Sequence, residues 1–527
     1  MRCLYVFFLL LPLFLILASA CGNSVTTEEI ENYDYDRVVD IASQESSHYA
    51  EEIAIYKYST GYFIASFELT LDYAINKANE RRNNFNELDL DRLWNLIQGQ
   101  EPWSLDLARF ANGNRVSSIS RDEAVYDANA LFQLLRHFYG GYNYFGGDEV
   151  FLPLFEDILK AIDEQEQWNT GLFIQLLRDY LSTVIADNHF FIESHDLGVS
   201  YNVFIWDTPF EKSENGFRKQ DTSLYVTDIV DHDMQEIFRL SVDEEGNFFY
   251  YIIIMNPENE GIIYNFDAVW STGEIETISL RRTLISPSIG SGAEPSLRYE
   301  NDIPIVTFRS KMGHPFHYHS YEDEYARIFL SLTEYLQGES VIIIDIRGNP
   351  GGYTSLTRIW LNMLLGEIVP SNFVLLESLW RGAMTQIPEN WYWFFEPIDK
   401  DNLAILDSIH ATEYLGNYHV FSSFPNQTIA NDILIILLVD RHTFSSGEIF
   451  TDQMLNIENT IILGQNTAGA LLTSSSHPLF LPNSGIRFFM GSIHFAFHDN
   501  EWKEGIGIAP DIWVIGDALT AALAIIE

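Results

Sequence analysis

The sequence predicts an α/β core that follows a helical N-terminal domain and a small β-rich module. Residues 341–346 and 433–439 are apolar runs rich in Ile, Leu and Val, which is typical of parallel strands covered on both faces. Each run leads through a glycine-containing turn into a helical pattern, at residues 356–365 and 447–454. Strands that alternate with helices in this way define an α/β fold.

Composition limits the class of protein further. The chain has 527 residues, enough for two to four domains, and 47% of them are hydrophobic, so a packed core is expected. Lys and Arg total 30 against 75 Asp and Glu, a formal net charge of −45. Such a surface repels nucleic acid and anionic lipid headgroups, so we expect no nucleic-acid partner.

The N-terminus predicts export. Arg2 precedes an apolar run at residues 4–17, which is shorter than the roughly 20 residues that span a bilayer. Small residues and Cys21 follow, and the segment Ala18-Ser-Ala-Cys21 resembles a bacterial lipobox with Ala18 in place of the usual leucine. We therefore expect residues 1–20 to be a lipoprotein signal peptide and Cys21 to carry the lipid. The alternative is an ordinary signal peptide with an incidental cysteine.

This prediction places the mature protein outside the cytoplasm, in a bacterial cell envelope, with its soluble body held at a membrane by the lipid anchor alone. The two cysteines of the chain are Cys3 and Cys21, so the mature protein has no cysteine pair for a disulfide.

Four further segments follow from the patterning. Residues 89–97 and 131–138 have apolar positions three and four apart, as in amphipathic helices, whereas 248–255 is one of several short β-type runs separated by turns. From these patterns we expect a polar tether at residues 21–36, a helical domain at 37–189, a β-rich module at 190–299 and an α/β catalytic domain at 300–527.

Two turns in the α/β region carry candidate chemistry. Gly351 and Gly352 end the first buried strand, where a turn can direct N–H groups at an anion. Ser445 and Ser446 follow the second strand and lie at the start of a helix, which favours negative charge. The alternative is structural, because Ser445 with Glu448 three residues later also matches a helix capping box.

Four motifs in order carry a family resemblance. They are Asp345-Ile-Arg-Gly-Asn-Pro-Gly-Gly352, Val439-Asp-Arg-His-Thr-Phe-Ser-Ser-Gly-Glu-Ile449, Ile462-Leu-Gly-Gln-Asn-Thr-Ala-Gly469 and Glu504-Gly-Ile-Gly-Ile-Ala-Pro-Asp511. Together they resemble the tail-specific, or C-terminal-processing, serine proteases, which include tricorn-like members. The resemblance implies a catalytic core of the crotonase/Clp-protease-like type and a serine peptidase that needs no cofactor and cleaves peptide or protein substrates.

The resemblance also implies roles for residues of both turns. Ser445 matches the nucleophile, with Ser446 as the adjacent alternative. The N–H groups of Gly351, Gly352 and Ser446 match the oxyanion donors. One position departs from the tail-specific branch, because Ala470 replaces the lysine that would deprotonate the serine, and no other lysine lies between Ser445 and Lys503.

The tricorn-like branch uses a histidine base, and this chain has Ile185-Ala-Asp-Asn-His-Phe190 where that motif belongs. His189 then matches the base, since an imidazole can accept a proton near neutral pH. Asn188 matches the polar residue beside the histidine, and Glu504 matches the glutamate that orients the site. The resemblance therefore implies a Ser445–His189–Glu504 site.

Two alternatives remain open in the sequence. His314, His317 and His319 lie in one short segment that allows a metal site, and His314 or His317 is the alternative base. We expect no metal, because the neighbouring proline and aromatic residues are typical of a loop. The missing lysine also allows a different class of protein, a catalytically degenerate surface lipoprotein that keeps the groove and binds without hydrolysis. The oligomeric state is left undetermined.

Overall fold

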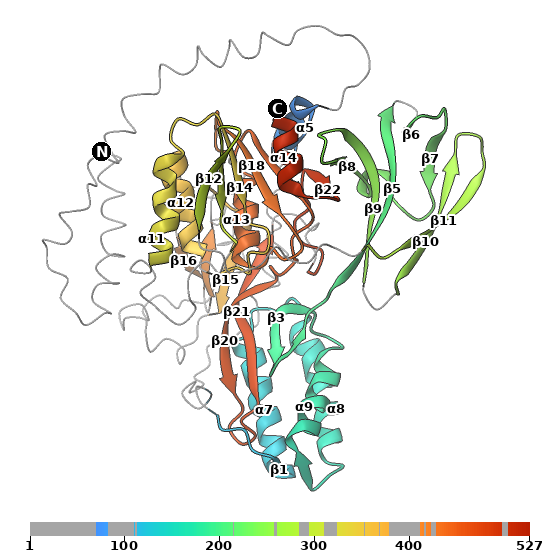
Figure 1. The fold of residues 1–527 in the computed structure, drawn as a ribbon. Coiled ribbons are helices and arrows are strands. Elements are labelled where there is room, and N and C mark those ends of the chain that lie inside the picture. Colours follow the sequence, from blue (N-terminus) through green and yellow to red (C-terminus); the bar gives the residue numbers. More distant parts are fainter. Residues whose placement is uncertain are drawn as a thin grey trace, which may run out of the picture. The chain divides into compact units, whose positions relative to one another are not determined.

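The computed structural model describes residues 70–82, 110, 113–213, 216–257, 261–283, 295–309, 324–352, 354–367, 369–378, 412–415, 418–422, 428–497 and 504–526 (Figure 1). The predicted signal peptide, the tether, Cys21, the helical pattern at 89–97 and the three histidines from His314 to His319 lie outside these residues. Within the described residues, no helix is both long enough and apolar enough to cross a membrane.

A parallel sheet forms the core of the predicted catalytic region. Strands β13 (Ile303–Thr307), β14 (Val341–Asp345), β18 (Leu434–Val439), β19 (Thr460–Gly464) and β22 (Ile512–Val514) lie in sheet order β22-β19-β18-β14-β13, and each pairs with its neighbour in parallel. The antiparallel strand β12 (Ser296–Glu300) closes this edge. The predicted α/β class is confirmed.

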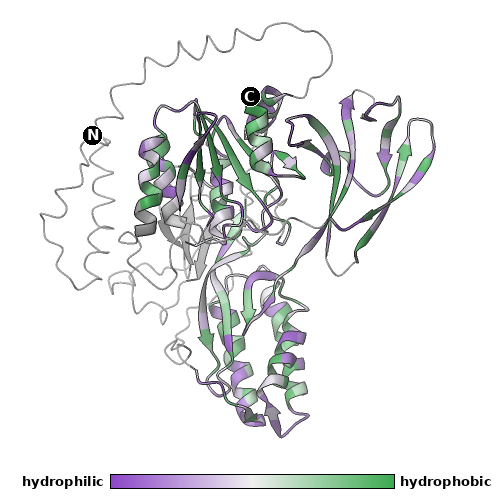
Figure 2. Cartoon of the chain, viewed as in Figure 1, coloured by the Kyte–Doolittle hydropathy of each residue, from purple (hydrophilic) through white to green (hydrophobic). Residues whose placement is uncertain are grey.

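Helices cover both faces of this sheet. Side chains alternate between the two faces along a strand, so Ile342 and Ile344 of β14 pack in one apolar cluster and Ile343 packs in another. The first cluster includes helices α11 (Glu324–Ser331), α12 (Thr354–Leu365) and α13 (Ser446–Met454), and the second includes α5 (Leu71–Arg82) and α14 (Ala518–Ile526). Figure 2 shows these central strands as mostly hydrophobic. The continuous apolar runs of the sequence follow from burial on both faces.

The β-rich strands belong to the same sheet. Strand β8 (Phe238–Val242) pairs in parallel with β22, with Trp513 opposite Ser241. The core sheet therefore continues into the strands that the sequence assigned to the β-rich module. From β8 the sheet continues in the order β9 (Phe248–Pro257), β5 (Tyr201–Ser213), β6 (Gly216–Lys219), β7 (Tyr225–Ile229), β10 (Ile263–Trp270) and β11 (Ile275–Arg281), and all of these pairs are antiparallel. The aromatic side chains of Phe204, Phe210 and Trp270 help to fill a separate apolar cluster here.

The helical region precedes these strands and packs against a hairpin from the catalytic region. Helices α7 (Arg121–His137), α8 (Gly147–Ile162) and α9 (Thr170–Leu181) share an apolar cluster with side chains from β20 (Thr473–Phe480) and β21 (Arg487–Phe497). Figure 1 shows the β20–β21 hairpin running beside α7. Strand β3 (Asp187–Ile192) pairs with β21, which brings the His189 motif to the catalytic region.

Two predicted domain boundaries fall inside strands. The boundary after residue 189 divides β3, and the boundary after residue 299 divides β12. Both strands pair with partners that are distant in sequence or in the next predicted domain, and composition does not reveal such pairing.

The other described elements are short or lie at the edges of the sheets. They are the 3-10 helix η3 (Leu332–Tyr335), helix α10 (Met234–Ile237) and strands β1 (Ser118–Ser120), β2 (Gln167–Asn169), β4 (His195–Leu197), β15 (Phe373–Ser378), β16 (Thr412–Leu415) and β17 (Tyr418–Ser422).

Candidate active site

Ser445 lies in a strained turn between β18 and α13. Its φ is 53° and its ψ is −116°, a conformation that side-chain-bearing residues seldom adopt. Such strain is typical of functional positions and stands at about 1–3 kcal/mol. The turn projects a half-buried serine at the N-terminus of a helix, where free N–H groups favour developing negative charge.

The neighbouring Ser446 has a different environment. Its side chain is 2% exposed and its hydroxyl donates a hydrogen bond to the carbonyl oxygen of Gly352. That hydroxyl therefore ties the helix start to the glycine turn. Of the two serines that the sequence proposes as nucleophile, only Ser445 faces the histidine.

His189 lies within hydrogen-bond distance of that serine. Its Nε2 is 3.0 Å from Ser445 Oγ, although the two residues are 256 positions apart in sequence. The Phe444 ring lies beside the imidazole, with the two ring centroids 5.1 Å apart. The distance is suitable for transfer of the serine proton to the ring nitrogen.

An irregularity in β3 presents the histidine. Asp187 pairs with Leu197 of β4 and Phe191 pairs with Asp196, so the residues between Asp187 and Phe191 interrupt the register. An interruption of this kind bends a strand and redirects its side chains. His189 lies within the interrupted stretch, so the ladder of β3 and β4 does not determine its orientation.

Glu504 acts on the main chain next to the histidine. Its Oε1 accepts the N–H of Asn188 at 2.8 Å and its Oε2 accepts the N–H of Leu472 at 3.0 Å. The Asn188 side chain in turn donates to the carbonyl oxygen of Gly469 at 2.8 Å. The structure thus brings together His189, Asn188, Ser445 and Glu504, and Glu504 reaches the site through backbone groups.

Glu448 binds the turn that carries Ser445 and the turn at residues 467–470. Its Oε2 accepts the N–H groups of Ser445 at 3.0 Å and Ala470 at 2.8 Å, and its Oε1 accepts the Thr467 hydroxyl and the Gly469 N–H, each at 2.7 Å. Ala470 is fully buried at the position where the family lysine would stand. The backbone half of the predicted capping box is therefore present, and the Glu448 carboxylate joins the two turns.

Burial shifts the titration of this site. It lowers the pKa of the His189 imidazole, and the negative charge of Asp187 opposes that effect in part. Burial also raises the pKa of Glu448 and, more strongly, that of Glu504, where the nearby charge of Asp187 adds to the effect. A lowered histidine pKa keeps the imidazole neutral near pH 7, as a general base requires.

The predicted oxyanion donors need one correction. The Gly351 N–H donates to Asn349 Oδ1 at 2.9 Å, so it is directed away from a substrate oxygen. Gly351 instead permits close approach, because its φ is +86° and a Cβ there would lie 2.7 Å from Ser445 Cβ and 3.0 Å from the Ser446 nitrogen. The N–H groups of Gly352 and Ser446 are the two predicted donors that remain.

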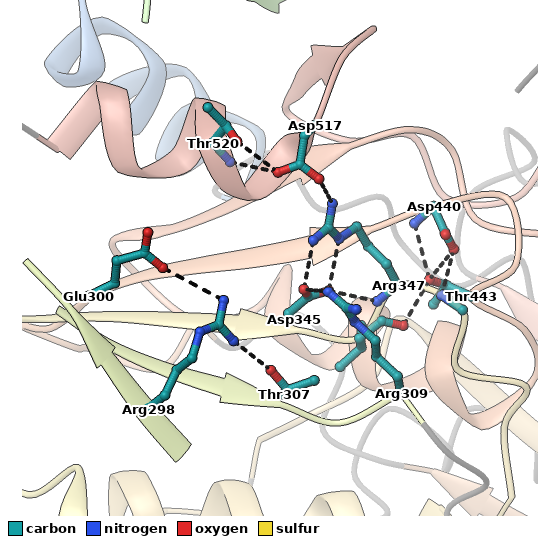
Figure 3. A network of polar contacts seen from close by, with 12 residues as sticks. Arg298, Glu300, Thr307, Arg309, Asp345, Arg347, Asp440, Thr443, Asp517 and Thr520 are labelled. Carbon is teal, nitrogen blue, oxygen red and sulfur yellow. Dashed lines mark hydrogen bonds and ion pairs between the residues drawn. The ribbon is translucent and has the colours of Figure 1, made fainter. Parts of the chain in front are cut away.

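A buried ion-pair network holds the strand that leads into this turn (Figure 3). Asp345 at the end of β14 is fully buried and pairs with Arg309 and with Arg347, whose Nη2 is 2.8 Å away. Arg347 Nη1 also contacts Asp517, the residue before α14, at 2.9 Å, and Asp440 Oδ1 accepts the N–H of Gly348. These contacts fix the first glycine turn relative to β18 and α14.

The competing predictions were a metal site and a replacement base in the histidine segment. Within the part of the chain that the structure describes, no group of three His, Cys, Asp or Glu side chains is arranged to hold a metal ion. His314, His317 and His319 lie outside that part, so neither the metal site nor the replacement base is tested.

The sequence did not predict the roles of two supporting residues. Asp187 lies within the His189 motif and Asn349 within the Asp345 motif, but nothing in their spacing indicates that they bind main-chain N–H groups. Asp187 is one of 75 acidic residues, and it is among the few that the described structure buries.

Comparisons with known proteins agree with this geometry. A serine and a histidine in contact beside a glycine turn define a serine-type hydrolase site. Residues 305–514 match the sequence profile of peptidase family S41. Residues 305–514 therefore form a serine-type peptidase domain of the tail-specific protease type, as the sequence motifs predicted. His189 lies outside the matched residues, so the profile does not assign the base.

The chain is also similar to solved structures of three proteases. It is 13% identical to mature CPAF over 75% of this chain and 92% of that chain, with a TM-score of 0.40. The photosystem II D1 C-terminal processing protease is 11% identical over 74% and 92%, at 0.34, and tricorn protease is 11% identical over 77% and 37%, at 0.30. No curated protein sequence matches the chain. The family assignment rests on the sequence match.

Proposed function

We propose that this peptidase is a secreted, lipid-anchored endopeptidase in which Ser445 is the nucleophile and His189 is the base. The observation that supports the proposal most is the 3.0 Å contact between His189 Nε2 and Ser445 Oγ. No lysine occupies the family position, where Ala470 is buried, so a histidine provides the basic group that the nucleophile requires.

The proposed reaction has two halves. His189 accepts the Ser445 proton as Oγ attacks the peptide carbonyl, and the oxyanion is held by the N–H groups of Gly352 and Ser446. The imidazolium then gives its proton to the leaving amine, and an acyl-enzyme forms. Water, deprotonated by His189, attacks the acyl carbon and releases the carboxylic acid and the free serine.

Glu504 and Asn188 have a positioning role in this proposal. Glu504 accepts the Asn188 N–H, and the Asn188 side chain holds the carbonyl of Gly469. Together they connect the stretch that carries His189 to the turn that follows β19. Their removal is expected to lower the rate through displacement of the base.

A fluorophosphonate probe tests the chemistry, because it reacts with an activated serine. We expect labelling of the wild type, loss of labelling in Ser445→Ala and a decrease of at least about 100-fold in His189→Gln. His442→Gln is the matched control, since His442 is exposed in the same loop. Ser446→Ala distinguishes the alternative nucleophile. A folded wild type that the probe does not label would support the non-hydrolysing binding protein instead.

The lipid anchor needs a separate test. Cells that express the full chain are fed an alkyne-tagged fatty acid, and the purified protein is examined for the tag. Incorporation in the wild type and its loss in Cys21→Ser support anchoring at Cys21 in the cell envelope. Equal incorporation in both proteins, or none in either, would remove the anchor from the proposal.

A further inference from the structure

Asp187 is a buried carboxylate next to the proposed base, and neither the family match nor the sequence motifs give it a role. It is fully buried, and its Oδ1 accepts the main-chain N–H of His189 at 2.8 Å. Its Oδ2 accepts the hydroxyls of Tyr139 and Thr473, each at 2.7 Å. Three donors from three parts of the chain therefore converge on one side chain.

These contacts replace the hydrogen bonds that an interrupted strand lacks. In a regular ladder, the N–H groups of β3 would alternate between its two neighbouring strands. In the interrupted stretch, the N–H of Asn188 goes to Glu504 and the N–H of His189 goes to Asp187. Two carboxylates thus hold the N–H groups of two consecutive peptides, Asp187–Asn188 and Asn188–His189. A shift of either would displace the imidazole from Ser445.

We propose that Asp187 is a positioning residue that fixes the backbone of His189 and places a carboxylate near its imidazole. This inference rests on the proposed role of His189 as base. The charge matters because proton transfer from Ser445 creates an imidazolium in a partly buried site, and a nearby carboxylate stabilises that cation. Glu504 is less suited to this task, because Asp187 is the carboxylate whose charge acts on His189, and the oxygens of Glu504 accept the N–H groups of Asn188 and Leu472.

The surroundings keep the carboxylate of Asp187 in place. Burial raises the pKa of Tyr139 well above its ordinary range, so its hydroxyl stays protonated and donates to Asp187. Glu504, which precedes β22, and Glu448, on α13, are the other acidic groups near this cluster. Of the three acids, Asp187 is the one whose charge opposes the effect of burial on the pKa of His189.

The first test compares Asp187→Asn with the wild type. Asparagine has the same shape, and its Oδ1 still accepts the His189 N–H. Its NH2 group replaces Oδ2, so the hydroxyls of Tyr139 and Thr473 have to turn from donors into acceptors. The substitution therefore removes the charge and keeps the contact with the His189 backbone. We expect the fluorophosphonate labelling rate at pH 7.5 to fall by about 10- to 100-fold. We also expect the acidic limb of the rate against pH to move lower by about one unit, because an imidazole without the nearby anion is harder to protonate.

Asp127→Asn is the matched control. Asp127 is also fully buried and also accepts several hydrogen bonds, from the N–H groups of Asn483 and Ser484 and from the Asn483 side chain, but it supports a turn remote from the nucleophile in the hydrogen-bond network. It is expected to lower the unfolding temperature without moving the acidic limb. An unchanged limb and an unchanged rate in folded Asp187→Asn would overturn the inference.

A second pair of variants covers the case in which Asp187→Asn does not fold. Tyr139 and Tyr142 are buried tyrosines whose hydroxyls donate to Asp187 at 2.7 Å and to Asp148 at 2.8 Å. Tyr139→Phe is expected to slow labelling by about fivefold, the equivalent of one net hydrogen bond. Tyr142→Phe is expected to leave the rate unchanged at a similar loss of stability. Equal rates in the two variants would overturn the inference.

The failures of the two proposals are distinguishable. If Ser445→Ala still reacts with the probe, the proposed nucleophile is wrong, whatever Asp187 does. If Ser445→Ala and His189→Gln lose labelling while Asp187→Asn keeps the wild-type rate and pH profile, the proposed function stands and the role of Asp187 is refuted.

Discussion

The carboxylate of Glu448 is the first contact to remove in a test of the structure, because it joins the nucleophile turn to the turn after β19. Each of its oxygens accepts two donors, at distances of 2.7 to 3.0 Å. Glu448→Gln replaces one oxygen by an NH2 group, which then faces two donors and can accept from neither. The substitution therefore removes two hydrogen bonds to a charged, fully buried group.

The magnitude follows from two opposing effects. Hydrogen bonds to charged groups contribute about 1.5 to 3 kcal/mol each, so the loss of two corresponds to about 3 to 6 kcal/mol. Burial raises the pKa of Glu448, which means that the charge itself is unfavourable in the folded state and that its removal recovers part of the loss. We therefore expect destabilisation near the lower value, about 3 kcal/mol, a large share of the usual 5–15 kcal/mol of total stability.

The assay is urea unfolding at pH 8, together with the labelling rate of the folded protein. A displacement of the Ser445 turn by about 1 Å is expected to slow labelling by about 100-fold. Glu123→Gln is the matched control, because Glu123 is the exposed capping-box glutamate of α7 and accepts the Ser120 N–H. The reasoning is refuted if Glu448→Gln unfolds at the wild-type urea concentration and reacts at the wild-type rate.

Three further predictions use the same structure. Glycine tolerates the positive φ of residue 445, whereas alanine does not, so Ser445→Gly is expected to be about 1 kcal/mol more stable than Ser445→Ala in thermal unfolding. A melting temperature of Ser445→Gly equal to or below that of Ser445→Ala would contradict the strain. Asp345→Asn leaves the buried guanidiniums of Arg309 and Arg347 without their shared anion, and urea unfolding is expected to show a loss of about 3 to 5 kcal/mol; a loss below about 1 kcal/mol would contradict it. Burial raises the pKa of Glu504 above its unfolded value, so its stabilising contribution is complete below the unfolded pKa and is lost as pH rises through the folded pKa. Wild-type melting temperatures are therefore expected to fall relative to those of Glu504→Gln as pH rises from 5 to 9, and parallel curves would refute this.

Local patterns in the sequence predicted the central part of the fold well. The run at residues 433–439 corresponds to β18, and the helical patterns at 356–365 and 447–454 correspond to α12 and α13 within one or two residues at each end. These elements are predictable because burial on both faces of a parallel sheet leaves a continuous apolar run, and because helix spacing repeats locally.

Long-range pairing was not predictable from the same signals. The parallel contact of β8 with β22 joins residues whose local sequence gives no indication of a shared sheet, so the middle strands were expected to form a separate module. The pairing of β3 with β21 is a second case, since the predicted boundary after residue 189 falls inside β3. Register between distant strands depends on the whole core and leaves no pattern in either strand alone.

The candidate site shows the same division. Motif order led to Ser445, His189 and Glu504, which the structure brings together. It also predicted the Gly351 N–H as an oxyanion donor, but that N–H donates to Asn349 instead. Asp187 was missed because its function depends on an interruption of β3 that no sequence pattern marks. Residues that touch the reacting atoms were thus easier to infer than residues that hold their backbone.

The site of fluorophosphonate attachment tests the central claim most directly. The folded wild-type protein is labelled, digested and sequenced by tandem mass spectrometry, beside His189→Gln treated in the same way. We predict one adduct, on Ser445, and at most a trace of it in His189→Gln. An adduct on Ser446 or on any other residue, or equal modification of Ser445 in both proteins, would contradict the account.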